Sequence, residues 1–428
     1  MIKHRTVSTT MVLFSILVLS ACSGLNASAP TKILNSVMST VLSAPVSSPV
    51  STPSAAHESA PVLPAKLTLV QSSTLPATSL AAYQQTLEQI YQKVIPSVVN
   101  VEVVLSSTTF VPRRLGGSGA PIQQSALGSG FVWDTQGHIV TNNHVIDGAT
   151  KISVTFADGT MVSAKLVGAD PNSDLAVIQV QVPASELKPV ELMDSAQVSV
   201  GQVAIAIGNP FGLSGTMTTG IVSGLNRSLP VGLDNQNSQS GPTYSIPDII
   251  QTDASINPGN SGGVLVDDHG EVMGVTAAIE SSTNSNSGIG FVIPSIIVQK
   301  VVPALITTGH YDHPQIGISG TNLTPDLVTA NKLPDNQQGI LVVNVIANGP
   351  AAKAGLKASS QQVATDGTAI PVGGDVIVSI DQHPVTRFED MVSYLFENTQ
   401  AGQTVTLDLL RNGQHKSISL TLGVLPTL

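Results

Sequence analysis

The sequence predicts a mainly β protein, because short apolar runs separated by tight turns recur over most of its length. Charged residues make up 11% and aromatic residues 3% of the 428 residues, whereas Gly and Pro number 37 and 27. Low charge with many small and turn-forming residues is typical of β-rich globules joined by flexible segments. The length exceeds that of one ordinary domain, so we expect at least two.

Charge and motif content argue against several kinds of partner. The formal net charge is −10, and no basic run exceeds the pair Arg113-Arg114, so we expect no nucleic-acid partner. The chain contains neither a Cys/His ligand set nor a glycine-rich phosphate loop. We therefore expect no metal and no cofactor.

Residues 1–22 are expected to be a secretory signal. Residues 3–5 are Lys-His-Arg, and residues 11–19 form an apolar core too short to span a bilayer. The segment ends Leu-Ser-Ala-Cys, which resembles a bacterial lipobox with Cys22 as the lipidated residue. That resemblance implies an exported, membrane-anchored lipoprotein in the periplasm or on the outer cell surface. A plain signal peptide with an incidental cysteine is the alternative.

Residues 23–78 are rich in Ser, Ala, Pro and Thr, a composition that predicts a disordered tether with a reach of roughly 40 Å. Apolar residues at steps of three and four then predict a helix over residues 79–94. Short strands, as in a β-barrel or sandwich, are expected at residues 97–105, 130–133, 138–142, 152–156, 162–167, 176–180, 203–207, 264–266 and 270–275. A connecting helix is expected within residues 294–308.

Three polar residues at strand ends predict a catalytic triad. Ser261 lies in the sequence Asn-Pro-Gly-Asn-Ser-Gly-Gly, between two apolar runs, while His144 ends one strand and Asp174 precedes another. A serine hydroxyl needs a base, and the base needs an orienting carboxylate. The chain order His, Asp, Ser is that of the chymotrypsin-type double barrel. Taken singly, each residue also has an ordinary structural explanation, as a strand-end histidine, a turn aspartate or a glycine-loop serine.

The glycines beside Ser261 predict an oxyanion hole. Gly259 and Gly262 allow backbone angles that residues with a Cβ resist. The backbone N–H groups of Gly259 and Ser261 are therefore expected to point the same way, as two donors for a tetrahedral oxyanion.

The segments that carry these residues resemble those of the HtrA (DegP/DegQ/DegS-like) serine proteases. The matching segments are residues 141–145, 173–177, 206–212, 220–223, 251–254, 259–263 and 288–294. The resemblance covers about residues 85–425. It implies a chymotrypsin-like double β-barrel protease domain over residues 79–298 and one α+β PDZ domain over residues 309–426.

The resemblance implies an extracytoplasmic, ATP-independent serine endopeptidase that degrades or processes unfolded polypeptides. It also implies a homotrimer, and a PDZ domain that binds peptide C-termini. One alternative is a chaperone or stress-sensing binding protein with a resting or weakly active protease domain. A structural lipoprotein of the envelope is a third interpretation, which leaves the triad unexplained.

The resemblance also suggests a primary substrate pocket. In the trypsin-like fold, the residue six positions before the nucleophile lies at the base of the pocket, and here it is Ser255. Ile256, Thr276, Ala277 and Ala278 are expected to line it. Apolar walls without a carboxylate favour small or medium aliphatic side chains, and the cleavage preference is expected to be broad.

In the second domain, Ile316, Gly317 and Ile318 resemble the loop of PDZ domains that binds a peptide carboxylate. A helix that carries apolar residues from 388 to 396 and the strand from Gly317 are expected to form the peptide groove by strand addition. Residues 358–372 are expected to form a loose polar excursion.

Two further stretches break the strand pattern and are expected to be loops, residues 106–125 and 226–247. The resemblance implies that the second loop senses activating peptides. A solvated hairpin tip is the alternative for it.

Overall fold

The computed structural model describes residues 77–105, 124–210, 215–231, 244–277, 288–365 and 368–426. The expected signal segment, Cys22 and nearly all of the expected tether lie outside these residues, as does most of the expected loop at residues 106–125. All described residues belong to one structural unit, Ser73–Leu428. Within them, no helix is long and apolar enough to cross a membrane.

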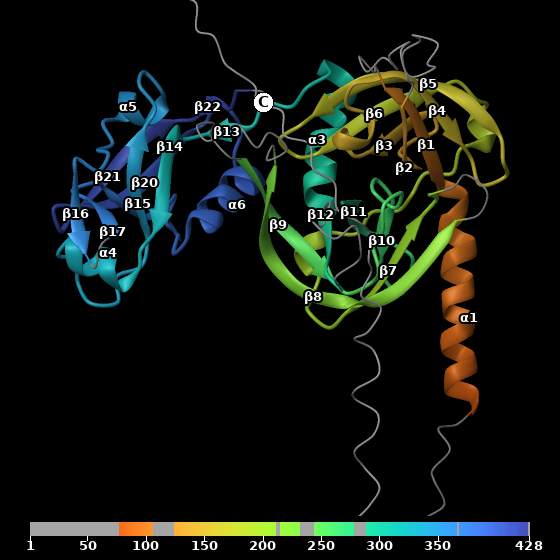
Figure 1. Ribbon diagram of the computed structural model, residues 1–428, viewed down its shortest axis with the longest axis horizontal. Helices are drawn as coiled ribbons and strands as arrows, with labels where there is room; N and C mark the ends of the chain where they lie inside the picture. The colour runs from red at the N-terminus through yellow and green to blue at the C-terminus, as the bar shows by residue number, and fades with distance from the viewer. Residues whose placement is uncertain are drawn as a thin grey trace, which may run out of the picture. The chain divides into compact units, whose positions relative to one another are not determined.

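Six antiparallel strands close a first barrel in the order β1-β2-β3-β6-β5-β4, drawn in brown to yellow in Figure 1. Val99, Val101 and Val103 of β1 are fully buried, because alternate side chains of a strand point to the same face. The strands are β1 (Val98–Leu105), β2 (Gln124–Val132), β3 (His138–Thr141), β4 (Ala149–Thr155), β5 (Met161–Asp170) and β6 (Leu175–Val180).

Six further antiparallel strands close a second barrel in the order β10-β11-β12-β9-β8-β7, drawn in green in Figure 1. One buried apolar cluster joins both barrels and includes Phe131 of the first and Ile205 of the second. The strands are β7 (Val203–Gly208), β8 (Thr216–Val231), β9 (Tyr244–Thr252), β10 (Val264–Val266), β11 (Val272–Ala277) and β12 (Gly290–Pro294). The predicted double barrel is confirmed.

Helices pack on the outside of the barrels. The predicted N-terminal helix is α1 (Ala77–Val94); its last turns bury Ile90 and Val94, whereas Leu80 near its start is 72% exposed. The predicted connecting helix is α3 (Ser295–Thr308), which contacts β5 and β6 of the first barrel and β11 and β12 of the second. Shorter helices are η1 (Ile95–Ser97), α2 (Asn143–Ile146), η3 (Ala184–Glu186) and η4 (Ser195–Gln197).

The expected loop at residues 226–247 is shorter than the sequence suggests. Residues 226–231 continue β8 and residues 244–247 begin β9, with Leu229 paired opposite Ile246. Ile246 is fully buried, so its apolar side chain keeps this part of the ladder in the barrel. The run of Asn, Gln and Ser residues between the two strands lies outside the described residues.

The C-terminal domain, drawn in blue tones in Figure 1, has a sheet of order β14-β15-β18-β20-β21, with β19 paired to β18. A second small sheet pairs β13 with β22. The helices are α4 (Pro325–Ala330), α5 (Pro350–Ala354) and α6 (Phe388–Asn398). The strands are β13 (Pro314–Gln315), β14 (Ile318–Asn322), β15 (Ile340–Val345), β18 (Val376–Ile380), β19 (His383–Pro384), β20 (Thr404–Arg411), β21 (Gln414–Thr421) and β22 (Gly423–Val424).

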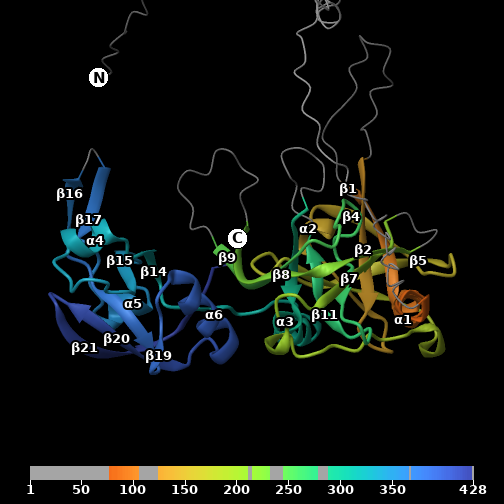
Figure 2. The same cartoon turned by 90° about the horizontal axis from the view of Figure 1, so that it is seen from below.

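The expected loose excursion at residues 358–372 is instead largely a β-hairpin. Its strands β16 (Gln361–Thr365) and β17 (Thr368–Val372) pair in regular antiparallel register. Figure 2 shows the hairpin beside α4, and Ile370 is 7% exposed in an apolar cluster that also contains Leu327 of α4. Ile370 therefore packs the hairpin against the apolar cluster of the PDZ domain.

Candidate active site

His144 and Asp174 form the hydrogen-bonded pair that the sequence predicts. His144 Nδ1 lies 2.7 Å from Asp174 Oδ2, and the backbone N–H of His144 donates to Asp174 Oδ1 over 2.9 Å. The carboxylate therefore holds both the ring and the backbone of one residue. Because an ionised carboxylate only accepts, this pair places a proton on Nδ1 and leaves Nε2 as the basic atom of a neutral ring.

Local geometry presents the two side chains to each other. His144 lies in the single turn α2 that follows β3, and Asp174 ends the turn between β5 and β6. Asp174 has a left-handed backbone with φ 53°, which is uncommon for a residue other than glycine. Its carbonyl accepts hydrogen bonds from Asn143 N and Asn142 Nδ2, at 3.1 and 2.9 Å. These two bonds to the α2 segment stabilise the strained turn.

Ser261 lies in the turn before β10 of the second barrel, directly beside β2 of the first barrel. Ser129 N donates to Ser261 O over 2.7 Å. A Cβ added to Gly128 would lie 2.6 Å from Val145 Cγ1 and 3.3 Å from Ser261 O. The backbone of β2 is therefore packed between Val145, the neighbour of His144, and Ser261, so residues of both barrels contribute to the candidate site.

The glycines of the loop that carries Ser261 have the backbone geometry predicted for them. Gly259 and Gly262 have φ of 94° and 84°, values that L side chains rarely adopt. A Cβ on Gly262 would also lie 2.1 Å from Ser129 O, and one on Gly259 would lie 2.5 Å from Pro210 Cβ. Both the turn and the close approach of the first barrel therefore require glycine.

Ser129 is a buried residue of this site that the sequence interpretation missed. It is fully buried, its hydroxyl donates to Gly259 O over 2.6 Å, and the same hydroxyl accepts from Asn209 N over 2.8 Å. The carbonyl of Ser129 accepts from Thr141 Oγ1 over 2.7 Å. A small hydroxyl between two glycines in an apolar strand was the available signal.

The residues expected to line the substrate pocket fall into three groups. Ile256 and Ala277 are 7% and 3% exposed, and the carbonyl of Ser255 accepts from Thr218 Oγ1 over 2.9 Å. Thr276 is 1% exposed and its hydroxyl donates to Asn260 O over 2.6 Å, so it holds the loop that carries Ser261. Ala278 lies outside the described residues.

The expected carboxylate-binding loop precedes an edge strand of the PDZ sheet. Gly317 has φ 84°, and its carbonyl accepts from Ile346 N over 3.0 Å. Ile316 is buried, whereas Ile318 is half-buried and begins β14. At the other end of β14, Asn322 Oδ1 accepts from Phe388 N over 2.6 Å, which ties the strand to the start of α6.

One residue of the expected groove helix points elsewhere. Met391 and Leu395 of α6 lie in the PDZ core, but Phe396 belongs to the apolar cluster of the barrels and α3. Its ring lies 5.9 Å from that of Tyr311 and 5.6 Å from that of His313. Phe396 therefore packs against the segment that connects the domains and not in the PDZ cluster with Met391 and Leu395.

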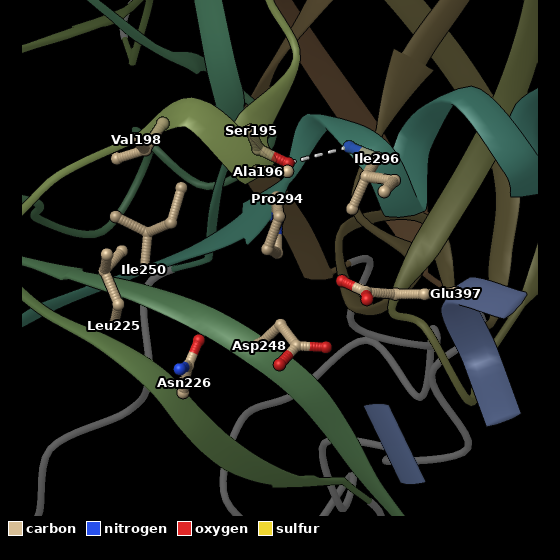
Figure 3. A pocket seen from close by; sticks show the side chains of 10 residues that line it. All are labelled: Ser195, Ala196, Val198, Leu225, Asn226, Asp248, Ile250, Pro294, Ile296 and Glu397. Carbon is tan, nitrogen blue, oxygen red and sulfur yellow. Dashed lines mark hydrogen bonds between the residues drawn. The ribbon is translucent and has the colours of Figure 1, made fainter. Parts of the chain in front are cut away.

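A cavity of about 90 Å³ lies away from the triad residues, beside η4, β9 and α6 (Figure 3). Asp248 of β9 and Glu397 of α6 line it, and Asp248 Oδ1 accepts from Ser393 Oγ over 2.7 Å. Burial raises the pKa of the Asp248 carboxyl, and burial and then the charge of Asp248 raise the pKa of the Glu397 carboxyl. The carboxylates of Asp248 and Glu397 therefore interact unfavourably when both are ionised.

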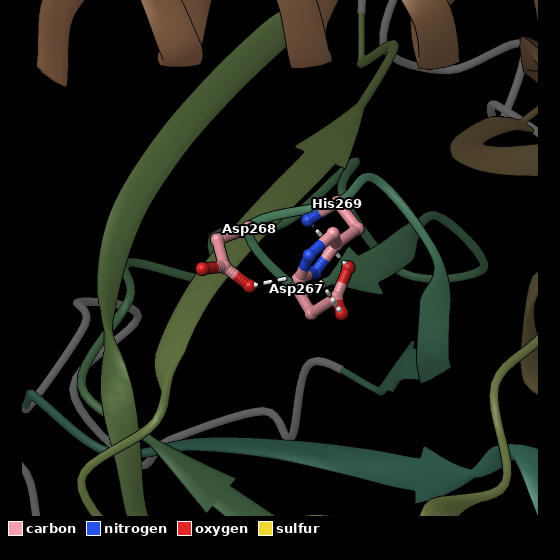
Figure 4. Close-up of side chains that lie close together, drawn as sticks. All are labelled: Asp267, Asp268 and His269. Carbon is pink, nitrogen blue, oxygen red and sulfur yellow. Dashed lines mark hydrogen bonds and ion pairs between the residues drawn. The ribbon is translucent and has the colours of Figure 1, made fainter. Parts of the chain in front are cut away.

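Asp267, Asp268 and His269 form a cluster of carboxylate and imidazole groups in the turn between β10 and β11 (Figure 4). Asp267 Oδ1 accepts from the backbone N–H groups of His269 and Glu271, both at 2.9 Å. The hydrogen bond to Asp267, followed by the charge of Asp268, raises the pKa of the exposed His269 ring. The hydrogen bonds that Asp267 accepts close the turn between β10 and β11, and this closure accounts for the position of the three side chains.

Comparison with known proteins identifies the same two domains. The family of trypsin-like peptidase domains matches residues 128–275, and the family of PDZ domains matches residues 314–422. Among solved structures, the HtrA-type protease AlgW with a tripeptide superposes with a TM-score of 0.62 at 33% identity. That match covers 80% of this chain and 98% of the AlgW chain.

Two relatives extend the likeness. Over 299 residues the chain is 42% identical to the chloroplastic Protease Do-like 1 of Arabidopsis thaliana, covering 70% of this chain and 64% of the relative. Over 387 residues it is 38% identical to the periplasmic serine endoprotease DegP of Escherichia coli strain K12, covering 82% of this chain and 76% of the relative. The chain therefore belongs to the HtrA family of serine endoproteases, with a trypsin-like peptidase domain followed by one PDZ domain, as the sequence predicted.

Proposed function

We propose that the chain hydrolyses peptide bonds of unfolded polypeptides through His144, Asp174 and Ser261, without ATP. Ser261 attacks the scissile carbonyl, and His144 takes the proton of the hydroxyl and later gives it to the leaving amine. Asp174 orients the imidazole and stabilises the imidazolium that forms. Water then hydrolyses the acyl-enzyme by the same route.

The proposed oxyanion hole consists of the backbone N–H groups of Gly259 and Ser261. The left-handed Gly259 and the hydrogen bond from Ser129 Oγ to Gly259 O support it, because they fix the orientation of the preceding and following peptide units. Donors that are held in place before the reaction stabilise the developing negative charge without reorganisation.

The observation that carries this proposal is the double contact of Asp174 with His144, at 2.7 Å to the ring and 2.9 Å to the backbone. Among the further His–Asp pairs of the described residues, His138 with Asp134, at 2.6 Å, lies at the ends of a hairpin turn of the same barrel. The first pair adjoins β2 through Val145, and β2 in turn bonds the Ser261 loop through Ser129 N. The pair of His138 with Asp134 therefore serves as an internal control for the catalytic one.

The proposed role of the PDZ domain is to bind exposed C-termini of the substrate. β14 is an edge strand, so a peptide can add to its outer side next to α6. The loop of Ile316, Gly317 and Ile318 would hold the terminal carboxylate with backbone N–H groups. The AlgW structures with bound peptides support peptide binding as a property of this family.

We further propose an extracytoplasmic protein that is anchored through a lipidated Cys22 and assembles as a homotrimer. The periplasmic relative DegP supports the location. The exposed apolar side chains of Leu80 and Tyr83, 72% and 47% exposed on α1, offer a surface for association. Labelling with a radioactive fatty acid, lost in Cys22→Ala, and light scattering of the purified protein test the two points separately.

The test of the triad is labelling by a fluorophosphonate, with and without casein as an unfolded protein. We expect labelling of the wild-type chain, none in Ser261→Ala, and very slow labelling in His144→Ala. The control His138→Ala is expected to label, because its ring belongs to the other pair.

Each outcome has a distinct meaning. Labelling only in the presence of casein would indicate a protease that substrate activates. If a folded wild-type chain fails to label under both conditions, the endopeptidase mechanism is wrong and a chaperone or sensor role replaces it.

A further inference from the structure

His313 lies where the chain leaves the protease domain and enters the PDZ domain. Its backbone carbonyl accepts from Leu425 N over 2.8 Å, and the next residue, Pro314, pairs with Val424 in the small sheet of β13 and β22. The backbone of His313 is therefore held by the C-terminal end of the PDZ domain, far along the chain from the catalytic residues.

The side chain of His313 points into the first barrel. Its Nε2 lies 2.7 Å from Asp170 Oδ2, and the two side chains are 1% and 2% exposed. The ring also contacts Tyr311 edge-on at 4.7 Å and Phe396 of α6 at 5.6 Å. Tyr311 is a titratable residue beside the pair of His313 and Asp170. Burial, and then the charge of Asp170, raise the pKa of the Tyr311 hydroxyl.

Asp170 in turn closes the turn that carries the catalytic carboxylate. It is the last residue of β5, its Oδ2 accepts from Ser173 Oγ, and its Oδ1 accepts from Asn172 N over 3.2 Å. Ser173 is 1% exposed and directly precedes Asp174, whose backbone has φ 53°. One buried carboxylate therefore fixes the turn from inside while the Asn142 and Asn143 bonds fix it from the side of His144.

Close packing keeps this junction in one place. A Cβ added to Gly168 of β5 would lie 2.7 Å from both Gly309 O and Leu305 O. The C-terminal end of α3 is thus in backbone contact with the strand that ends at Asp170. Small displacements of the segment between α3 and β13 are then transmitted to His313 and Asp170, because neither neighbour leaves free space.

We infer that His313 and Asp170 are positioning residues for peptide hydrolysis, linking the anchored PDZ junction to the orientation of Asp174. This inference rests on the proposed function, because it assigns Asp174 its catalytic role. A hydrogen bond from His313 Nε2 holds the Asp170 carboxylate, and that carboxylate holds the turn of Ser173 and Asp174. Neither residue touches the substrate.

Two substitutions at one position separate the hydrogen bond from packing. His313→Phe keeps an aromatic ring against Tyr311 and Phe396 but removes the donor to Asp170. His313→Gln loses the ring but keeps an N–H donor near the position of Nε2. If the hydrogen bond positions Asp174, the Gln variant retains most of the activity and the Phe variant loses it.

The readout is the pH profile of kcat/KM for casein cleavage by the full chain, together with the rate of fluorophosphonate labelling. For His313→Phe we expect a loss of about 10- to 100-fold, the size of effect that a misplacement of about 1 Å produces. A displaced Asp174 stabilises the imidazolium of His144 less well. The acid limb of the profile therefore moves to lower pH, whereas partial unfolding would lower the plateau without moving the limb.

His138→Phe is the matched control, since it removes another buried histidine that is paired with an aspartate of the first barrel, and its limb is expected to stay in place. A limb that stays in place in His313→Phe as well overturns the positioning role. Should His313→Phe fail to fold by near-UV circular dichroism, Ser173→Ala decides the question, because it removes only one hydroxyl of the same path. An unmoved limb in Ser173→Ala then overturns the inference.

Labelling of the wild-type chain separates failure of the positioning role from failure of the proposed triad. If the wild-type chain labels at Ser261 and the variants behave like wild type, the triad stands and only the positioning role is wrong. If the folded wild-type chain does not label at all, the proposed mechanism fails and the positioning role fails with it.

Discussion

Asp174 accepts hydrogen bonds from both the ring and the backbone of His144, at 2.7 and 2.9 Å, while its own backbone is held in the left-handed region. An amide in place of the carboxylate offers one acceptor and one donor, so it cannot serve both contacts and favours the wrong tautomer. Asp174→Asn is therefore expected to lower kcat by about 10⁴-fold with little change in stability.

Kinetics of peptide cleavage and thermal unfolding of Asp174→Asn check this expectation together. The side-chain amide of Asn is compatible with the left-handed backbone, so the fold should be retained. A variant with kcat within tenfold of wild type would show that Asp174 does not orient the catalytic base.

The hydroxyl of Ser129 joins two backbone groups that belong to the second barrel, Gly259 O and Asn209 N. In Ser129→Ala both groups lose a buried partner, and each loss costs about 1–3 kcal/mol. We expect a lower midpoint in urea and slower labelling of Ser261, because the Gly259 carbonyl is free to rotate. The exposed Ser163 of β5 provides the matched control, Ser163→Ala, which is expected to change neither quantity.

The raised pKa of the Asp248 carboxyl predicts how the free energy of unfolding depends on pH. Burial raises the pKa of its carboxyl, the hydrogen bond from Ser393 opposes the rise, and the charge of Asp390 adds to it. Glu397 also has a raised pKa, through burial and the charges of Asp248 and Asp194, against the lowering effect of Lys300. In the pH range between the ordinary and the raised pKa values, the folded state binds more protons than the unfolded state, so stability falls as pH rises.

Asp248→Asn removes this unfavourable charge and keeps an acceptor for Ser393. We expect a higher Tm at pH 8, by about 2–4 °C, which corresponds to about 1 kcal/mol in a domain of 150–250 residues. The difference from wild type should shrink as the pH falls through the raised pKa values. The control is Asp335→Asn at an exposed site; a pH-independent difference for Asp248→Asn would contradict the assignment.

The ion pair of Arg411 with Asp375 predicts a substitution that destabilises the PDZ domain. Arg411 donates to both carboxylate oxygens of Asp375 at 2.7 Å, and the Asp375 side chain is fully buried. Arg411→Met leaves that charge without its partner, which costs about 3–5 kcal/mol. Arg411→Lys is expected to be intermediate, because one ammonium cannot make two parallel bonds.

Two spectroscopic signals test this prediction. Trp133, the single tryptophan of the chain, lies in the first barrel, so its fluorescence reports unfolding of the protease domain. Far-UV circular dichroism reports both domains. In Arg411→Met the circular dichroism should therefore show an early transition that the fluorescence does not follow; coincident transitions would mean that the pair stabilises the chain as a whole.

The sequence predicted those elements whose signals are local. The strand Val264–Val266 agrees in both bounds and α1 agrees to within two residues, because turn residues and apolar periodicity mark their ends. The extension of β8 was missed: its ladder with β9 has three register shifts, and its residues include Gly, Asn and Pro. An interrupted ladder leaves no simple alternation for sequence to reveal.

The residues of the candidate site also divide into those with a local sequence signal and those without one. The glycines at 259 and 262 follow from their motif, since a tight turn requires them wherever the rest of the chain lies. Ser129 and the pair of Asp170 with His313 do not follow, because their partners are distant along the chain; Asp170 and His313 are 143 residues apart. Only packing in three dimensions makes such residues neighbours.

The proposed catalytic residues lie on two different barrels, and this division has a further consequence. His144 and Asp174 belong to one barrel and Ser261 to the other, and the seam between them depends on a few buried bonds such as that from Ser129 N to Ser261 O. In the proposed mechanism the nucleophile and its base therefore keep their relative position only while this seam between the barrels is intact. A substitution that opens the seam without unfolding either barrel would thus abolish the proposed peptide hydrolysis while both domains stay folded.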